Sequence, residues 1–140
     1  MPYADDATRL RAIKGNFGSA KVAGAPSTLY VALLRHATDP ATILGTEPDS
    51  TGDYARVAVS NVDAEWTFGT VDAANTNEIR WPTSTGLYSI TDPLNQWGIF
   101  DNAAGSVCLA FGELTTPITV TGAGDTPVIP ALDLVLTQAA

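Results

Sequence analysis

Short runs of strand-forming residues, each ended by turn residues, are the feature that most restricts the fold of this chain. Val, Ile, Leu, Thr and aromatic residues fill the runs, and Gly, Pro, Asn and Asp separate them. The 12 glycines and nine prolines follow no fixed period, which favours many strands joined by turns. The predicted strands cover residues 28–34, 54–60, 65–68, 77–81, 95–100, 106–113, 116–121 and 132–137.

This spacing predicts a mainly β protein, either an antiparallel β-sandwich or a Greek-key barrel-like domain. The run 28–34 is nearly continuous in apolar residues, which indicates a strand covered on both faces. Residues 95–113 are the best hairpin candidate, because Asp, Asn and Gly lie in the connection at 101–105. Pro127 and Pro130 flank Val128 and Ile129 and restrict that pair to an edge strand or a connector.

One short α-helix over residues 4–16 is predicted before the β domain. Ala7, Leu10, Ile13 and Phe17 recur every three to four residues and form one apolar stripe. A helix this short is marginal alone in water, so the stripe must pack on the domain or on another subunit. We interpret residues 1–140 as a single domain with a helical arm and linker at 1–26 and a β domain at 27–140.

Charge is unevenly distributed. The formal net charge of −8 argues against nucleic-acid binding, which depends on clustered Lys and Arg. Four of the seven basic side chains lie in the first 21 residues: Arg9, Arg11, Lys14 and Lys21. Residues 81–140 contain no Lys or Arg. The basic residues of the arm are either a solvated helix face or a surface that docks on an acidic neighbour.

The sequence offers little that could carry catalysis or hold a cofactor. His36 and Cys108 are the single histidine and the single cysteine, which excludes an internal disulfide and a cysteine zinc cluster. No nucleophile, metalloprotease or nucleotide-binding motif occurs, so we expect a non-enzymatic protein without a cofactor. Two acidic clusters could contribute calcium ligands, although solvated loops without metal are the expectation: Glu47, Asp49 and Asp53, and Asp101 with Asn102.

The same sequence gives no indication of membrane insertion or export by its own signal. No segment approaches the roughly 20 apolar residues that a membrane helix needs. Asp5 and Asp6 occupy positions where a signal peptide carries positive charge and then an apolar core. We therefore expect synthesis in the cytoplasm, with exit only as part of a larger particle, and no membrane partner.

The aromatic residues permit two hypotheses. Trp66, Trp81 and Tyr88 could stack against sugars on a flat platform, as candidate glycan-binding residues, with Tyr54 and Trp97 beside them. Alternatively, the tryptophans are anchors of the core or of a subunit interface, since large aromatic side chains dominate both settings. The core or interface role is the expectation.

Five phrases along the chain together resemble a known family. They are STLYVALL at 27–34, GTEP at 45–48, GDYAR at 52–56, WGIFDNAAG at 97–105 and LTTP at 114–117. In this order and spacing the chain resembles small virion structural proteins of tailed bacteriophages, often labelled tail-fibre or head-decoration proteins.

The resemblance implies a non-enzymatic virion component that binds the major capsid protein or other virion proteins and self-associates, for example as a trimer. It favours a capsid decoration or cement protein on the assembled shell. The alternative is a tail-fibre or baseplate protein, including a carbohydrate-binding receptor module. The candidate partner-binding residues all lie in the predicted helix or at its end: Arg9, Leu10, Arg11, Ile13, Lys14 and Phe17.

Overall fold

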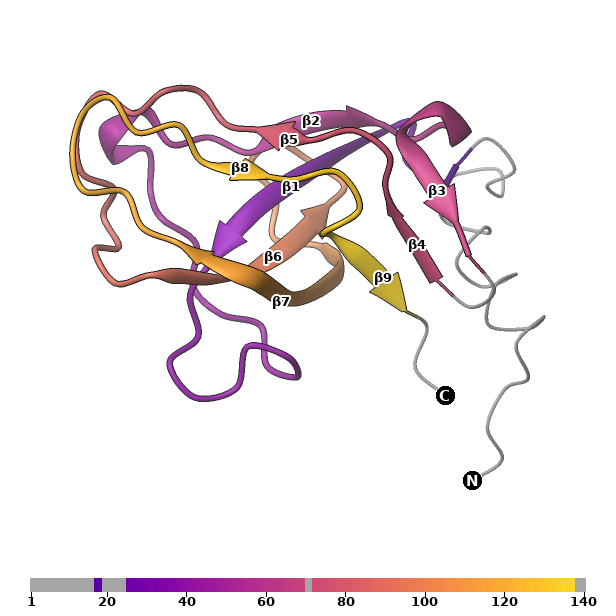
Figure 1. The fold of residues 1–140 in the computed structure, drawn as a ribbon, viewed down its shortest axis with the longest axis horizontal. Helices are drawn as coiled ribbons and strands as arrows, with labels where there is room; N and C mark the ends of the chain where they lie inside the picture. Colours follow the sequence, from indigo (N-terminus) through magenta and orange to yellow (C-terminus); the bar gives the residue numbers. More distant parts are fainter. Residues whose placement is uncertain (1–16, 19–24, 70–71, 138–140) are drawn as a thin grey trace.

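The computed structural model describes residues 17–18, 25–69 and 72–137. The strands of these residues form three antiparallel sheets (Figure 1). The four-stranded sheet has the order β2 (Val57–Ser60), β1 (Thr28–Leu34), β6 (Leu94–Phe100) and β7 (Cys108–Ile118). The three-stranded sheet has the order β3 (Trp66–Phe68), β4 (Asp72–Asn75) and β9 (Val135–Thr137). The third sheet pairs β5 (Ile79–Arg80) with β8 (Val128–Ile129).

The mainly β, antiparallel prediction is confirmed, and the described strands do not close into a barrel. Two short 3₁₀ turns, Thr51–Asp53 and Asp63–Glu65, are the helical segments of the described residues. The predicted helix over residues 4–16 lies outside the described part of the chain.

The continuous apolar run of β1 places this strand at the centre of the protein. Leu29, Val31 and Leu33 alternate toward one core and are fully buried. Ala32 and Leu34 point to the opposite face, and they are also buried. The prediction of a strand covered on both faces is therefore confirmed.

All three sheets contribute to one hydrophobic core. Side chains of β1 and β6 meet there across register pairs such as Val31 with Ile99 and Leu33 with Trp97. The core also receives one or more side chains from each of the other sheets, including Trp66, Ile79 and Leu136. Packing between sheets, and not within one hairpin, holds the fold together.

Several strand boundaries differ from the sequence prediction. The predicted hairpin at 95–113 exists as β6 and β7, but the separate runs 106–113 and 116–121 form the single strand β7. Pro117 is tolerated inside it because β7 is an edge strand, bonded to β6 alone. β4 was not predicted, since Asp72, Ala73, Ala74 and Asn75 carry little β propensity. Hydrogen bonding to β3 on one side and to β9 on the other stabilises this strand despite its low β propensity.

Candidate interaction surfaces

Arg56 lies at the centre of a cluster that joins three separate segments. Its guanidinium donates to both carboxylate oxygens of Glu47, with Nη2–Oε1 at 2.8 Å and Nε–Oε2 at 3.0 Å. Nη1 donates to the carbonyl of Asn102 at 2.8 Å. The guanidinium carbon is 3.7 Å from the centroid of the Phe100 ring, a cation–π contact. The Tyr54 hydroxyl donates to Glu47 Oε2 at 2.7 Å. We call these five residues the Arg56 cluster.

The Arg56 cluster is shielded from solvent and balanced in charge. The side chains of Arg56 and Glu47 are 8% and 22% exposed. Hydrogen bonding to Glu47 raises the pKa of Arg56 above its usual value. Burial, with the Glu47 carboxylate beside it, raises the pKa of Tyr54 far above its usual value, so this phenol stays neutral. The cluster is therefore an internal connection, in which the charged groups satisfy each other.

Three of the five phrases that carry the family resemblance meet in this cluster. GTEP supplies Glu47, GDYAR supplies Tyr54 and Arg56, and WGIFDNAAG supplies Phe100 and Asn102. A shallow cavity of about 280 Å³ lies beside it, lined by residues 47–50, 54–56 and 103–104. At its wall Glu47 and Arg56 already bond each other, and Asp49 accepts from the N–H of Thr51, so the arrangement supports a structural role for these phrases.

The loop that follows β1 is fixed by a buried amide. Gln96 of β6 is fully buried, and its Nε2 donates to the carbonyls of Pro40 and Ile43, each at 2.7 Å. Its Oε1 accepts from the N–H of Gly45 at 2.6 Å. We call residues 36–45 the anchored loop. Sequence reasoning missed Gln96, although a glutamine inside an apolar strand is a signal of a buried hydrogen-bonding role.

The next residue back along β6 holds the start of this loop. Asn95 accepts from the His36 backbone N–H at 3.0 Å and donates to the His36 carbonyl at 2.7 Å. Beyond these anchors, Ile43 and Leu44 expose 49% and 39% of their surface. The anchored loop is thus held at its base and presents two apolar side chains at its surface.

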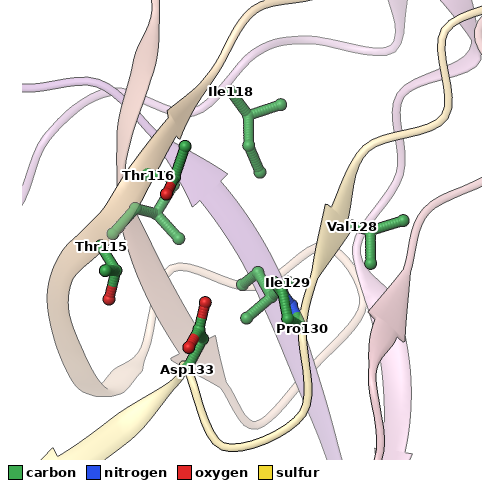
Figure 2. A pocket seen from close by; sticks show the side chains of 8 residues that line it. Thr115, Thr116, Ile118, Val128, Ile129, Pro130 and Asp133 are labelled. Atoms are coloured by element: carbon green, nitrogen blue, oxygen red, sulfur yellow. The ribbon is translucent and has the colours of Figure 1, made fainter.

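An apolar groove lies between β7 and β8. Figure 2 shows Thr116 and Ile118 of β7 on one side, Ile129 and Pro130 on the other, and Asp133 at one end. Its cavity is about 200 Å³. This is below the roughly 300–1,000 Å³ of pockets that hold drug-sized ligands, so its size suits one or two side chains of a protein partner.

The turn that closes one end of the groove is held in a strained conformation. Leu132 has φ of 67°, which is unusual for a leucine, and it exposes 54% of its surface. The buried Asn75 side chain holds the turn by donating to the Pro130 carbonyl at 2.9 Å and accepting from the Leu134 N–H at 2.9 Å. The turn between the lining residues Pro130 and Asp133 is therefore fixed, and it carries an exposed apolar side chain beside the groove.

The predicted partner-binding residues fall almost entirely outside the described part of the chain: Arg9, Leu10, Arg11, Ile13 and Lys14. Phe17 is described, and it is buried at 6% exposure, edge-to-face with Trp66 at 5.7 Å between ring centroids. The adjacent N–H of Gly18 donates to the buried Asn61 side chain at 2.7 Å. The assignment of Phe17 to a partner surface is therefore corrected, because this ring joins the arm to its own domain.

The candidate glycan-binding residues are parts of the core. Trp66, Trp81 and Tyr88 are 2%, 1% and 2% exposed, so no ring face of these three is open to a sugar. Tyr88 packs edge-to-face against Tyr54 at 5.3 Å, and Trp97 is 2% exposed. The stacking platform is corrected in favour of the core alternative, because each ring is covered on both sides.

The remaining candidate groups have local roles. Hydrogen bonds from Thr51 lower the pKa of Asp49, whereas burial raises the pKa of the Cys108 thiol, which also donates to the Ala110 carbonyl at 3.2 Å. Within the described ranges, no group of three or more His, Cys, Asp or Glu side chains is placed to hold a metal ion. No helix among the described residues is long and apolar enough to cross a membrane.

Comparison with known families adds one assignment. The model of a family described as "Podophage GP4 fiber I protein gp80" matches residues 12–137. The match spans all three sheets and every member of the Arg56 cluster. A search of curated proteins gave no significant match.

Proposed function

This chain belongs to the family of the podophage GP4 fiber I protein gp80 and is a structural protein of phage virions, and we propose that it is a non-enzymatic component of a fibre. The match over residues 12–137 carries this proposal, because it includes nearly the whole chain. The family description concerns a fibre, so we favour a fibre over decoration of the capsid shell.

The chemistry of the Arg56 cluster supports a structural role. A catalytic site needs a group that is free to act on a substrate, whereas Glu47 and Arg56 bond each other and Tyr54 is kept protonated. The cluster fixes the segments around it and leaves binding to other surfaces. The exposed apolar residues of the anchored loop and the β7–β8 groove are surfaces of the described residues suited to contact other virion proteins.

Immunogold electron microscopy of intact virions tests this function. A gold-tagged antibody against the chain should label fibres, and labelling should disappear when the antibody is first saturated with purified protein. Label spread over the head would instead support capsid decoration. Absence of label from particles would overturn a place in the virion, and substrate turnover lost in His36→Ala would overturn the non-enzymatic assignment.

A further inference from the structure

We propose that His36 is a pH-sensitive switch of the anchored loop: its neutral ring holds the first half of the loop, and protonation of the ring releases that half. The loop carries the exposed side chains of Ile43 and Leu44, so acidification changes an apolar surface that is open to partners. The switch lies within one chain, so its test on the isolated protein does not depend on the fibre role proposed above.

The ring of His36 accepts hydrogen bonds from the backbone that follows it. Its Nδ1 lies 3.0 Å from the backbone nitrogen of Asp39 and 3.3 Å from that of Thr38, and both N–H groups donate to it. A neutral imidazole has one accepting and one donating nitrogen, so these bonds require Nδ1 without a proton and Nε2 with one. In the imidazolium ion both nitrogens donate. Protonation of Nδ1 therefore removes the acceptor and places a third N–H donor against the other two.

Asp39 connects the ring of His36 to the exposed part of the loop. Its backbone N–H donates to the ring, its carbonyl accepts from the Ile43 N–H at 3.1 Å, and its carboxylate accepts from the Thr42 hydroxyl. One residue thus joins the turn at His36 to the turn that leads to Ile43 and Leu44. When the ring no longer accepts from Asp39, the second turn loses the bond that fixes its first residue.

The base of the loop is held by groups whose charge does not change between pH 5 and 8. The neutral amide of Gln96 accepts from the Gly45 N–H at 2.6 Å. The backbones of Arg35 and Thr46 bond each other at 2.8 and 2.9 Å. Only histidine among the side chains changes charge in this range from its ordinary value. Acidification is therefore expected to open the loop on the His36 side and to leave its base closed.

No ion pair compensates for the charge of a protonated His36 among the described residues. On its own segment, Asp39 already accepts from Thr42, and the Arg35 guanidinium donates to the Pro93 carbonyl. From β6, the group that bonds the His36 backbone is the neutral amide of Asn95. The other charged groups of the segments next to the loop are Asp92 before β6, Glu113 opposite Gln96 on β7, and Glu47 after the loop. Protonation thus removes two accepted hydrogen bonds and gains no ion pair.

NMR spectroscopy of the isolated protein between pH 8 and pH 5 tests the switch. The amide signals of Thr38, Asp39 and Ile43 should shift together with those of the His36 ring as it is protonated. Their protection from hydrogen exchange, relative to the intrinsic rate at each pH, should fall about tenfold or more. The Gly45 amide is the internal control, and its protection should change by less than about twofold.

His36→Asn is the matched control variant. The side-chain oxygen of asparagine takes the same place relative to Cβ as Nδ1 of histidine. It accepts readily from N–H groups two and three residues further along the chain, as in turns and at helix N-termini. This oxygen does not titrate. The variant should protect the Thr38 and Asp39 amides at pH 8 as the unchanged protein does, and it should keep that protection at pH 5.

Two results would overturn the proposal. One is protonation of the His36 ring without any change in the protection of the Thr38, Asp39 and Ile43 amides, because the ring would then not hold the loop. The other is an equal loss of protection on acidification in His36→Asn, because a different group would then be responsible.

Discussion

The Arg56 cluster allows a direct test of burial as the source of an ion pair's strength, through the change Glu47→Gln. The substituted amide keeps the size of the side chain and one acceptor oxygen for Tyr54. It removes the negative charge that the Arg56 guanidinium contacts through Nη2 and Nε at 2.8 and 3.0 Å. Arg56 is then left 8% exposed without a counter-charge, although its bond to Asn102 and its contact with Phe100 remain.

The expected loss follows from the exposure of the pair. Removing one partner of a fully buried ion pair costs about 3–5 kcal/mol. Because Glu47 is 22% exposed, water can compensate part of this loss, and we expect the free energy of unfolding to fall by about 2–3 kcal/mol. For a domain of 140 residues this corresponds to a decrease in Tm of about 8–12 °C, at roughly 4 °C per kcal/mol.

The protein contains a matched control. Glu78 and Arg80 form an ion pair of almost the same length, 2.9 Å, but their side chains are 49% and 57% exposed. Glu78→Gln should therefore change the free energy of unfolding by less than about 1 kcal/mol. Urea unfolding at pH 7 and equal protein concentration measures both variants. Equal losses for Glu47→Gln and Glu78→Gln would refute the argument that burial strengthens the Glu47–Arg56 pair.

Three further changes test other parts of the structure. Gly112→Ala would place its Cβ 2.6 Å from the Trp97 ring, so we expect the free energy of unfolding to fall by about 1–3 kcal/mol in thermal denaturation. The control Gly86→Ala, whose Cβ would meet no atom within 4 Å, should leave the free energy of unfolding nearly unchanged. Gln96→Ala leaves three backbone groups of the anchored loop without their partner, and should cost about 2–3 kcal/mol and accelerate amide hydrogen exchange in that loop. The pKa of Tyr54 is raised in the folded state, so above pH 10 the phenol ionises more readily in the unfolded chain than in the folded protein. The contribution of Tyr54 to stability is therefore present below pH 10 and decreases above it. Urea midpoints measured from pH 8 to 12 should fall less steeply in Tyr54→Phe than in the unchanged protein.

The local sequence pattern was sufficient to predict a strand where the residues of that strand share one kind of environment. The residues of β1 are nearly all apolar, and residues on both faces of that strand are buried. The β6–β7 hairpin was likewise predicted from its turn residues. By contrast, β4 has no distinctive sequence, and Pro117 lies inside β7, so the extent of these strands depends on their neighbours in the sheets.

The candidate surfaces could be predicted less well from the sequence, because tertiary structure decides which residues meet there. Glu47 and Arg56 are nine residues apart in a segment without regular periodicity, so nothing in their spacing required them to meet. From composition the core or interface role was the expectation for Trp66 and Trp81 and a sugar platform was the alternative, and the burial of their rings supports the core. A buried amide such as Gln96 can be predicted from the sequence, because it is a polar residue inside an otherwise apolar strand.

The separation of charge along the chain bears on how this protein can associate. Four of its seven basic side chains lie before residue 25, and residues 81–140 contain none. Two of the three arginines of the β domain are paired within the domain, because Arg56 bonds Glu47 and Arg80 bonds Glu78. Contacts between surfaces of opposite charge are favoured over contacts between like charges, so we expect an acidic partner at the first 24 residues and not at the described strands. The Arg56 cluster contributes indirectly, because it fixes the segments around it and leaves other surfaces to make contacts.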